Sequence, residues 1–158
     1  MQITIRKLTE DDCYDLWAWR NHPEVRKWSF NTEVIDYDAH KKWFKMRFND
    51  KKVRMYIAEI EGAQKIGQIR FDKDMDTRWH ININLNPQFF GKGLGADVIQ
   101  LATNYFLNEE GNASEVMAKI KDENQASLKA FRKAGFACLD QLENNKDNIN
   151  IFTYKRRA

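Results

Sequence analysis

The chain has 158 residues, a length typical of one domain, and we expect a single domain over residues 1–158. Its 26 basic and 23 acidic residues are mixed along the chain and give a formal net charge of +3, so bulk charge does not indicate nucleic acid as a partner. Cys13 and Cys138 lack metal or redox spacing, and no apolar run reaches membrane-spanning length. These features favour a cytoplasmic protein with no membrane segment and no metal site.

Hydrophobic periodicity predicts strands and helices in mixed order. In chain order these are strand 2–7, helix 9–19, a loop through Asn31, helix 36–48, strand 53–60, strand 65–72, strand 78–85, helix 92–108, strand 115–121, helix 124–134, strand 136–143 and strand 148–156. Hairpin connections are expected at residues 64–65 and 144–147. A central strand–helix–strand unit requires parallel pairing, so the expected architecture is α/β (α+β in some schemes), with a mixed, mainly antiparallel seven-stranded sheet and about four helices.

The most informative stretch is residues 87–96, Pro-Gln-Phe-Phe-Gly-Lys-Gly-Leu-Gly-Ala, between a predicted strand and a predicted helix. The first turn of a helix carries unpaired N–H groups, and the macrodipole adds about half a positive charge there. Gly91, Gly93 and Gly95 lack the side chains that would keep a phosphate away from those amides. We therefore expect a pyrophosphate-bearing ligand on residues 91–96.

Three phosphate-binding motifs compete for this turn, and a plain glycine-rich connection is the remaining alternative. A P-loop requires Ser or Thr after its lysine, whereas glycine follows Lys92, so that motif is excluded. The dinucleotide fingerprint G-x-G-x-x-G/A fits residues 91–96 nominally. However, the acidic residues at the expected distance, 109–110, lie in a helical tail instead of at a strand end.

The third motif is the acyl-CoA turn of the GNAT acetyltransferase superfamily, Gln/Arg-x-x-Gly-x-Gly/Ala after a strand that ends in x-Pro. The chain resembles it at Asn86-Pro87 and Phe90-Gly91-Lys92-Gly93-Leu94-Gly95, with Phe90 in the place of the leading Gln or Arg. Residues 122–136 resemble the second GNAT hallmark, Asn-x-x-Ala/Ser-x-x-aromatic-x-Lys-x-Gly-Phe. Asp122 or Asn124 can cap the predicted helix of that segment, and Gly135 suits its left-handed C′ position.

This resemblance covers nearly the whole chain and implies the GNAT fold with acetyl-CoA as the cofactor. It further implies that the coenzyme contacts the end of strand 78–85, the glycine turn and helix 124–134. The residues carried over are Leu85, Phe90, Gly91, Lys92, Gly93, Leu94, Gly95, Ala96, Asn124, Ser127 and Phe131.

Strand 79–85 alternates between apolar odd positions and polar even ones, which places His80, Asn82 and Asn84 on one face. Interior strands of α/β sheets are normally apolar on both faces, so this face indicates a polar cleft, unless it is an outward face or an edge strand. Many GNAT relatives carry a catalytic glutamate seven residues before the proline of x-Pro, and His80 occupies that position here. An imidazole, whose unperturbed pKa is about 6.5, can take a proton from an amine at neutral pH. His80 is therefore the candidate general base, and a hydrogen-bonded structural histidine is the alternative.

The route of the second proton, back to the CoA thiolate, is less defined. The usual GNAT donor is a tyrosine four residues before the glycine of Gly-Phe, where this chain has Phe131. Ser127 stands where a branch resembling the ribosomal-protein acetyltransferases has a serine beside the sulfur, so it could position the thiol. A CoA thiolate is a tolerable leaving group, so an acid can be dispensable and Ser127 can equally be a plain helix-surface residue.

The N-terminal half bears on the acceptor. Arg20-Asn21-His22-Pro23, an aromatic cluster and His40 resemble the amino-sugar acetyltransferases of pseudaminic-acid-type pathways, which act on the 4-amino group of a nucleotide-linked sugar. Aromatic rings suit sugars or bases, and guanidinium groups suit phosphates. The resemblance implies a UDP-amino sugar as the acceptor, in contact with Arg20, Asn21, His22, Trp28, Phe30, His40 and Asn82. Ordinary core packing explains many of the aromatic residues equally well, and Phe131 departs from the Tyr of those enzymes.

Two alternative functions share the fold. One is a protein N-terminal or aminoglycoside-type acetyltransferase, although the basic, aromatic N-terminal segment argues against a peptide acceptor. The other is a non-catalytic acyl-CoA-binding module, consistent with the missing tyrosine and the altered residue at position 90. Either a monomer or a homodimer is compatible with the sequence.

Overall fold

A computed structural model of the chain describes residues 2–139 and 148–157. Seven strands form one sheet in the order β1-β2-β3-β4-β5-β7-β6. The strands are β1 (Thr4–Lys7), β2 (Val53–Ile60), β3 (Gln64–Met75), β4 (Arg78–Leu85), β5 (Glu115–Lys121), β6 (Ala137–Cys138) and β7 (Ile149–Lys155). The helices are α1 (Cys13–Asn21), α2 (Pro23–Trp28), α3 (Tyr37–Phe48), α4 (Gly95–Glu109) and α5 (Gln125–Lys133), with short 3-10 turns η1 (Glu10–Asp12), η2 (Glu61–Ala63) and η3 (Pro87–Phe89).

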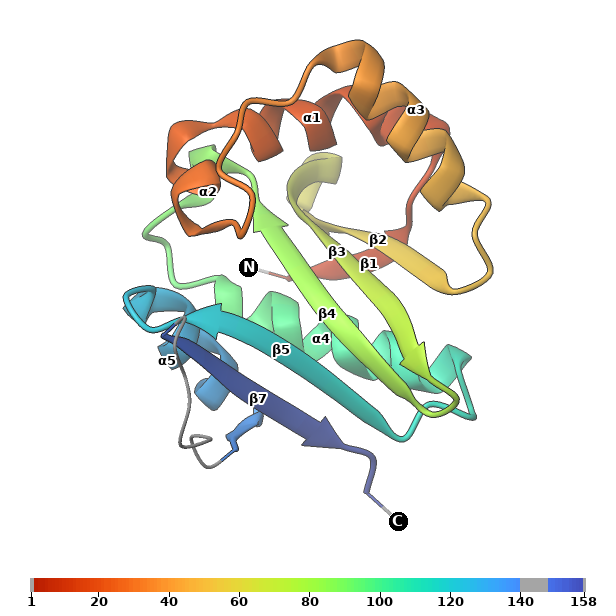
Figure 1. Ribbon diagram of the computed structural model, residues 1–158, viewed down its shortest axis with the longest axis vertical. Helices are drawn as coiled ribbons and strands as arrows, with labels where there is room; N and C mark the ends of the chain where they lie inside the picture. Colours follow the sequence, from red (N-terminus) through yellow and green to blue (C-terminus); the bar gives the residue numbers. More distant parts are fainter. Residues whose placement is uncertain (1, 140–147, 158) are drawn as a thin grey trace.

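The pairing confirms the expected mixed, mainly antiparallel sheet. Among the described strands only β4 and β5 pair in parallel, and α4 makes the crossover between them behind the sheet (Figure 1). On that face the Phe106 ring of α4 stacks on Phe71 of β3 at a centroid distance of 4.2 Å. On the other face, α1 and α3 cover β2 through a second apolar cluster that contains Leu16, Phe44 and Ile57. Both faces of the central strands are therefore covered in part by helices.

The structure corrects the expected elements between β1 and α3. The expected helix 9–19 is divided into η1 and α1, and the expected loop through Asn31 contains α2. Pro23 occupies the first turn of α2, where its missing N–H costs nothing, and the His22 ring nitrogen Nδ1 accepts a hydrogen bond from the Glu24 amide at 3.2 Å. Pro23, which lies in the expected loop, therefore marks the start of a helix.

Other boundaries differ by a few residues or lie outside the described part. Helix α4 begins at Gly95, not at residue 92, because Gly91 and Gly93 have φ angles of +73° and +71°. The β2–β3 hairpin turns at η2 and not at residues 64–65. Strands 53–60, 78–85 and 115–121 are confirmed to the residue. Within the expected strand 136–143, β6 covers only Ala137–Cys138. Residues 140–143 and the expected connection at 144–147 lie outside the described residues.

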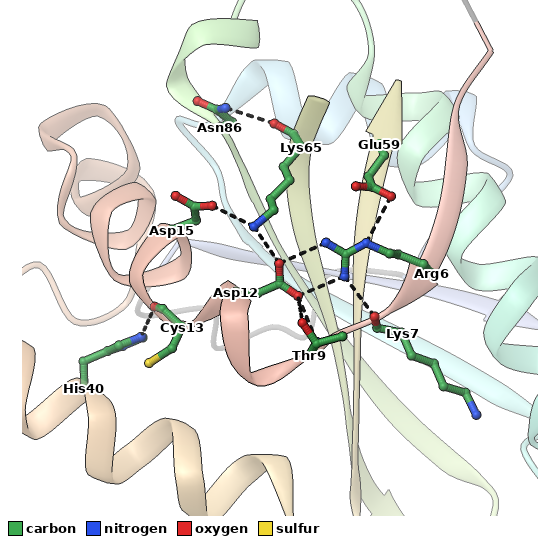
Figure 2. A network of polar contacts seen from close by, with 10 residues as sticks. All are labelled: Arg6, Lys7, Thr9, Asp12, Cys13, Asp15, His40, Glu59, Lys65 and Asn86. Atoms are coloured by element: carbon green, nitrogen blue, oxygen red, sulfur yellow. Dashed lines mark hydrogen bonds and ion pairs between the residues drawn. The ribbon is translucent and has the colours of Figure 1, made fainter. Parts of the chain in front are cut away.

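A buried carboxylate connects the first strand, the start of α1 and the sheet (Figure 2). The Asp12 carboxylate accepts two hydrogen bonds from Arg6 at 2.9 and 3.0 Å and lies 2.8 Å from the Lys65 ammonium of β3. Burial would raise the pKa of Asp12, but the hydrogen bonds from Arg6, Lys65 and the Thr9 amide hold it well below its usual range. The network fixes where α1 begins on the sheet.

Candidate active site

The sheet opens between its two parallel strands. Arg78, Trp79 and His80 pair with Glu115, Val116 and Met117 respectively, and no further pairing joins β4 to β5. Beyond His80 the two strands diverge (Figure 1). The second half of β4 therefore presents backbone groups that no neighbouring strand satisfies on the β5 side.

The glycine turn follows the open end of β4. A Cβ atom built on Gly91 or Gly93 would meet nothing within 4 Å, so the space above both residues is free. No described residue accepts a hydrogen bond from the peptide nitrogens of residues 91–97. Leu94, only 7% exposed, anchors the turn in the core. The turn combines free amides, open space and the positive end of α4, which together fit a diphosphate group.

Helix α5 lies beside the start of α4. A Cβ on Gly95 would come within 3.6 Å of the Ala130 Cβ atom, so the two helices approach closely there. The Asn124 side chain caps α5 by accepting a hydrogen bond from the Ser127 amide at 3.2 Å, so of the two expected caps it is Asn124 and not Asp122 that serves. Ser127 is half-buried in the first turn of α5.

Phe131 is buried, as Leu94 and Ala96 of the expected coenzyme site also are. The Phe131 ring is 3% exposed and packs edge-on against Phe136 at a centroid distance of 5.1 Å. Phe131 is therefore a core residue of α5, and its contact with the coenzyme stays a prediction.

His80 lies at the point where the β4–β5 pairing ends. Its ring nitrogen Nε2 is 3.0 Å from the Asp74 carboxylate, which also accepts two hydrogen bonds from Arg78 at 2.6 and 2.9 Å. The hydrogen bonds from His80 and then from Arg78 hold the pKa of Asp74 below its usual range. An ionised Asp74 can only accept from Nε2, which leaves Nδ1 of His80 as the nitrogen with a free lone pair.

Three of the residues expected at the acceptor site make structural contacts. Asn21 exchanges two hydrogen bonds with the backbone of Ile35, both at 2.8 Å. His22 caps α2, and its ring is 6.1 Å from that of Phe90. His40 is 4% exposed, and its Nε2 bonds to the Cys13 carbonyl oxygen at 2.9 Å (Figure 2).

The His40 side chain is enclosed by protein. Burial lowers the pKa of His40, whereas the hydrogen bond that its ring donates to the Cys13 carbonyl oxygen acts in the opposite direction. The side chain lies between α1 and α3, where it is closed off from solvent. The structure therefore gives His40 a packing role in place of the expected acceptor contact.

The remaining acceptor residues lie near the open end of the strands. Phe30 is 57% exposed, and Asn82 is exposed on the polar face of β4. Lys121, at the end of β5, donates to the Ser29 carbonyl oxygen at 2.8 Å and lies 6.0 Å from the Phe30 ring centroid. Lys121 was not among the residues predicted from the sequence, although a cation directly before residues 122–136 was a signal for it.

An open groove of about 800 Å³ runs between α1 and the segment that precedes the glycine turn. Trp19 and His22 line one side, and Lys65, Asn86 and Phe89 line the other. The groove thus lies between the N-terminal helices and the segment that leads into the glycine turn.

The fold and the site define a class of protein. A mixed sheet that opens between a parallel strand pair, next to a glycine turn with free amides, is the arrangement of an acyl-CoA-dependent N-acyltransferase. The acetyltransferase (GNAT) domain family matches residues 2–137. The chain belongs to this family.

Individual similarities agree with the family. An uncharacterized protein of Methanocaldococcus jannaschii is 26% identical over 137 residues, which make up 85% of this chain and 28% of that protein. The chain thus spans less than a third of that relative. A spermidine N(1)-acetyltransferase of Escherichia coli K12 is 24% identical over 149 residues, or 89% of this chain and 75% of that protein.

Solved structures show the same fold. The spermidine N-acetyltransferase from Vibrio cholerae, in complex with CoA and spermine, has a TM-score of 0.85 at 16% identity, over 98% of this chain and 95% of that one. An aminoglycoside acetyltransferase in complex with coenzyme A and kanamycin has a TM-score of 0.82 at 18% identity, with the same coverage.

Within residues 2–139 and 148–157, no helix is both long and apolar enough to cross a membrane. The same residues contain no group of three or more His, Cys, Asp or Glu side chains arranged to hold a metal ion.

Proposed function

We propose that the protein transfers an acetyl group from acetyl-CoA to a small primary amine by direct attack of the amine. The observation that carries the proposal is the set of unpaired amides at residues 91–97, next to the opening between β4 and β5. These amides would hold the diphosphate of the coenzyme, and the opening would receive its thioester arm. Acetyl-CoA supplies the acetyl group as an activated thioester.

The acceptor amine must lose a proton, and we assign that role to His80. Its Nε2 is held by Asp74, so Nδ1 is the atom that would accept the proton. Asp74 touches neither substrate in this proposal and acts as a positioning residue for the imidazole. His80 lies at the last paired position of β4 and β5, beside the place where the strands separate.

Ser127 is proposed to orient the sulfur atom of the coenzyme. It lies in the first turn of α5, which packs beside the start of α4. A serine hydroxyl is a poor acid, so Ser127 would hold the departing thiolate by a hydrogen bond without protonating it.

For the acceptor, we keep the amino group of a nucleotide-linked amino sugar as the favoured candidate. Exposed Phe30 and half-buried Trp28 can stack on a sugar or a base, and Arg20 supplies a cation on α1. The similar proteins named above favour a different candidate, an aminoglycoside or a polyamine such as spermidine. A non-catalytic acyl-CoA-binding module is the remaining possibility.

A thiol-release assay with acetyl-CoA and a panel of amines tests the proposal. The panel contains a nucleotide-linked amino sugar, free amino sugars, an aminoglycoside, spermidine and a peptide N-terminus. We expect turnover with at least one of the small amines, and His80→Gln to lower kcat for it by about 10²–10⁴-fold. The Kd for CoA should stay unchanged in that variant. CoA binding without turnover on any amine would replace this proposal by the non-catalytic module.

A further inference from the structure

The polar face of β4 continues onto β3. Across the antiparallel β3–β4 ladder, Gln68 is paired with Asn84, Arg70 with Asn82 and Asp72 with His80. Alternate residues of a strand share a face, so Gln68 and Arg70 lie on the same side of the sheet as the candidate base. The sequence analysis did not single out either residue.

Arg20 belongs to α1, which covers this face of the sheet. Gln68 and Arg70 pair with Ile57 and Met55 of β2, and those two residues belong to the apolar cluster that packs under α1. The pKa of Arg20 is held below the usual range first by burial and then by the neighbouring charges of Arg70 and Arg26. Among the described residues no carboxylate lies within ion-pair distance of Arg20. The Arg20 guanidinium group therefore has like charges near it and no ion-pair partner among the described residues.

Two donors in this region have no acceptor among the described residues. The Arg20 atom Nη1 is buried and unpartnered, whereas Nη2 donates to the Asn31 carbonyl oxygen at 2.6 Å. Gln68 is 2% exposed, and its Nε2 is also buried and unpartnered. Buried donors without acceptors are rare in native proteins, and a charged one is especially costly.

Arg70 adds positive charge that is only partly compensated. It forms one ion pair, with Asp72 at 3.0 Å, and its guanidinium group lies 5.3 Å from the Trp43 ring centroid. Asp72 is shared with Arg47, whose guanidinium nitrogen is 3.6 Å away. Arg26 differs, since its nitrogens donate to the carbonyl oxygens of Asn21 and Thr32.

We propose that Arg20, Arg70 and the Gln68 amide form an anion subsite that binds a phosphate group of the acceptor amine. This inference rests on the proposed function and makes it more specific, because it names the atoms that select the acceptor. A phosphate would give Arg20 Nη1 and Gln68 Nε2 the acceptors that they lack, and it would separate two like charges. The subsite favours phosphorylated or nucleotide-linked amines and disfavours amines that carry positive charge alone.

The competing source of phosphate is the coenzyme itself. The test therefore titrates inorganic pyrophosphate into protein saturated with CoA, by isothermal titration calorimetry at low ionic strength. We expect binding by the wild type and at least a tenfold higher Kd in both Arg20→Gln and Arg70→Gln. The control is Lys45→Gln, which removes one exposed cation of α3 and should leave the Kd unchanged.

Three results would overturn the inference: no pyrophosphate binding by the CoA-saturated wild type, binding only when CoA is absent, or an equal loss in Lys45→Gln. Arg70→Gln leaves the Arg20–Asn31 contact intact, so it remains informative if Arg20→Gln fails to fold. A kinetic experiment compares glucosamine 6-phosphate with glucosamine as acceptors. In the wild type we expect at least a tenfold lower KM for the phosphorylated amine. In Arg70→Gln we expect the two amines to have equal KM values. Pyrophosphate binding without turnover of any amine would support the subsite and contradict the proposed function.

Discussion

Asp12→Asn is the perturbation whose magnitude follows most directly from the structure. The substitution keeps the size of the side chain and removes its charge. Asp12 is fully buried and neutralises both Arg6 and Lys65, and its side chain also accepts from the Thr9 amide at 2.8 Å. The asparagine would leave Arg6 and Lys65 without the carboxylate that they share. Arg6 would keep its ion pair with Glu59, and Lys65 its ion pair with Asp15.

Removing one partner of a buried ion pair typically costs about 3–5 kcal/mol. For a domain of this size, that free energy corresponds to a fall in Tm of about 6–20 °C. Urea and thermal unfolding followed by circular dichroism measure both quantities. Asp11→Asn is the matched control, because Asp11 is the exposed neighbour of Asp12 and its substitution should change stability by less than about 0.5 kcal/mol.

The effect should also depend on pH. The pKa of Asp12 is lowered in the folded protein, so its stabilisation is complete above the unfolded-state pKa of about 3.9 and is lost as the pH falls through the folded-state pKa. The difference between wild type and Asp12→Asn should therefore be constant near neutral pH and shrink below about pH 4. Equal Tm values for Asp12→Asn and Asp11→Asn at pH 7 would refute the reasoning.

Two further substitutions test the site. Asp74→Asn should lower kcat about tenfold with the Kd for CoA unchanged, because the His80 imidazole loses the carboxylate that orients it. The control is Asp76→Asn, at an exposed turn position. An equal loss of kcat in both variants would argue against this role of Asp74. Asn124→Ala should destabilise the protein by about 1 kcal/mol through loss of the α5 cap, seen as a lower Tm, and Asn124→Asp should retain the wild-type value. An unchanged Tm in Asn124→Ala would show that the cap is dispensable.

Local signals predicted the parts of the fold that depend on short stretches of chain. Strand 78–85 follows from strict alternation, and the turn after it follows from glycines that adopt positive φ angles. The cap at Asn124 and the C′ glycine at Gly135, with φ of +99°, are also local features. Each of these elements can be read from fewer than ten consecutive residues.

Features that arise from packing were not predictable in this way. Helix α2 was missed because Pro23 suits a helix start as well as a break. Arg70 and Gln68 lie on the face of the sheet that α1 covers only because of the β2–β3 register and the packing of α1, which no sequence period reveals. His40 belongs to the segment that resembles the amino-sugar acetyltransferases, yet its burial between α1 and α3 determines its contacts.

The central claim is that the amides of residues 91–97 hold the diphosphate of coenzyme A. The most direct measurement is the Kd for CoA of Gly93→Val compared with Gly62→Val. Gly62 has a φ of +74° and free space around its Cβ position, as Gly93 does, so both substitutions impose similar backbone strain. We predict that the Kd rises at least tenfold in Gly93→Val and stays at the wild-type value in Gly62→Val. The same Kd in both variants would contradict the claim.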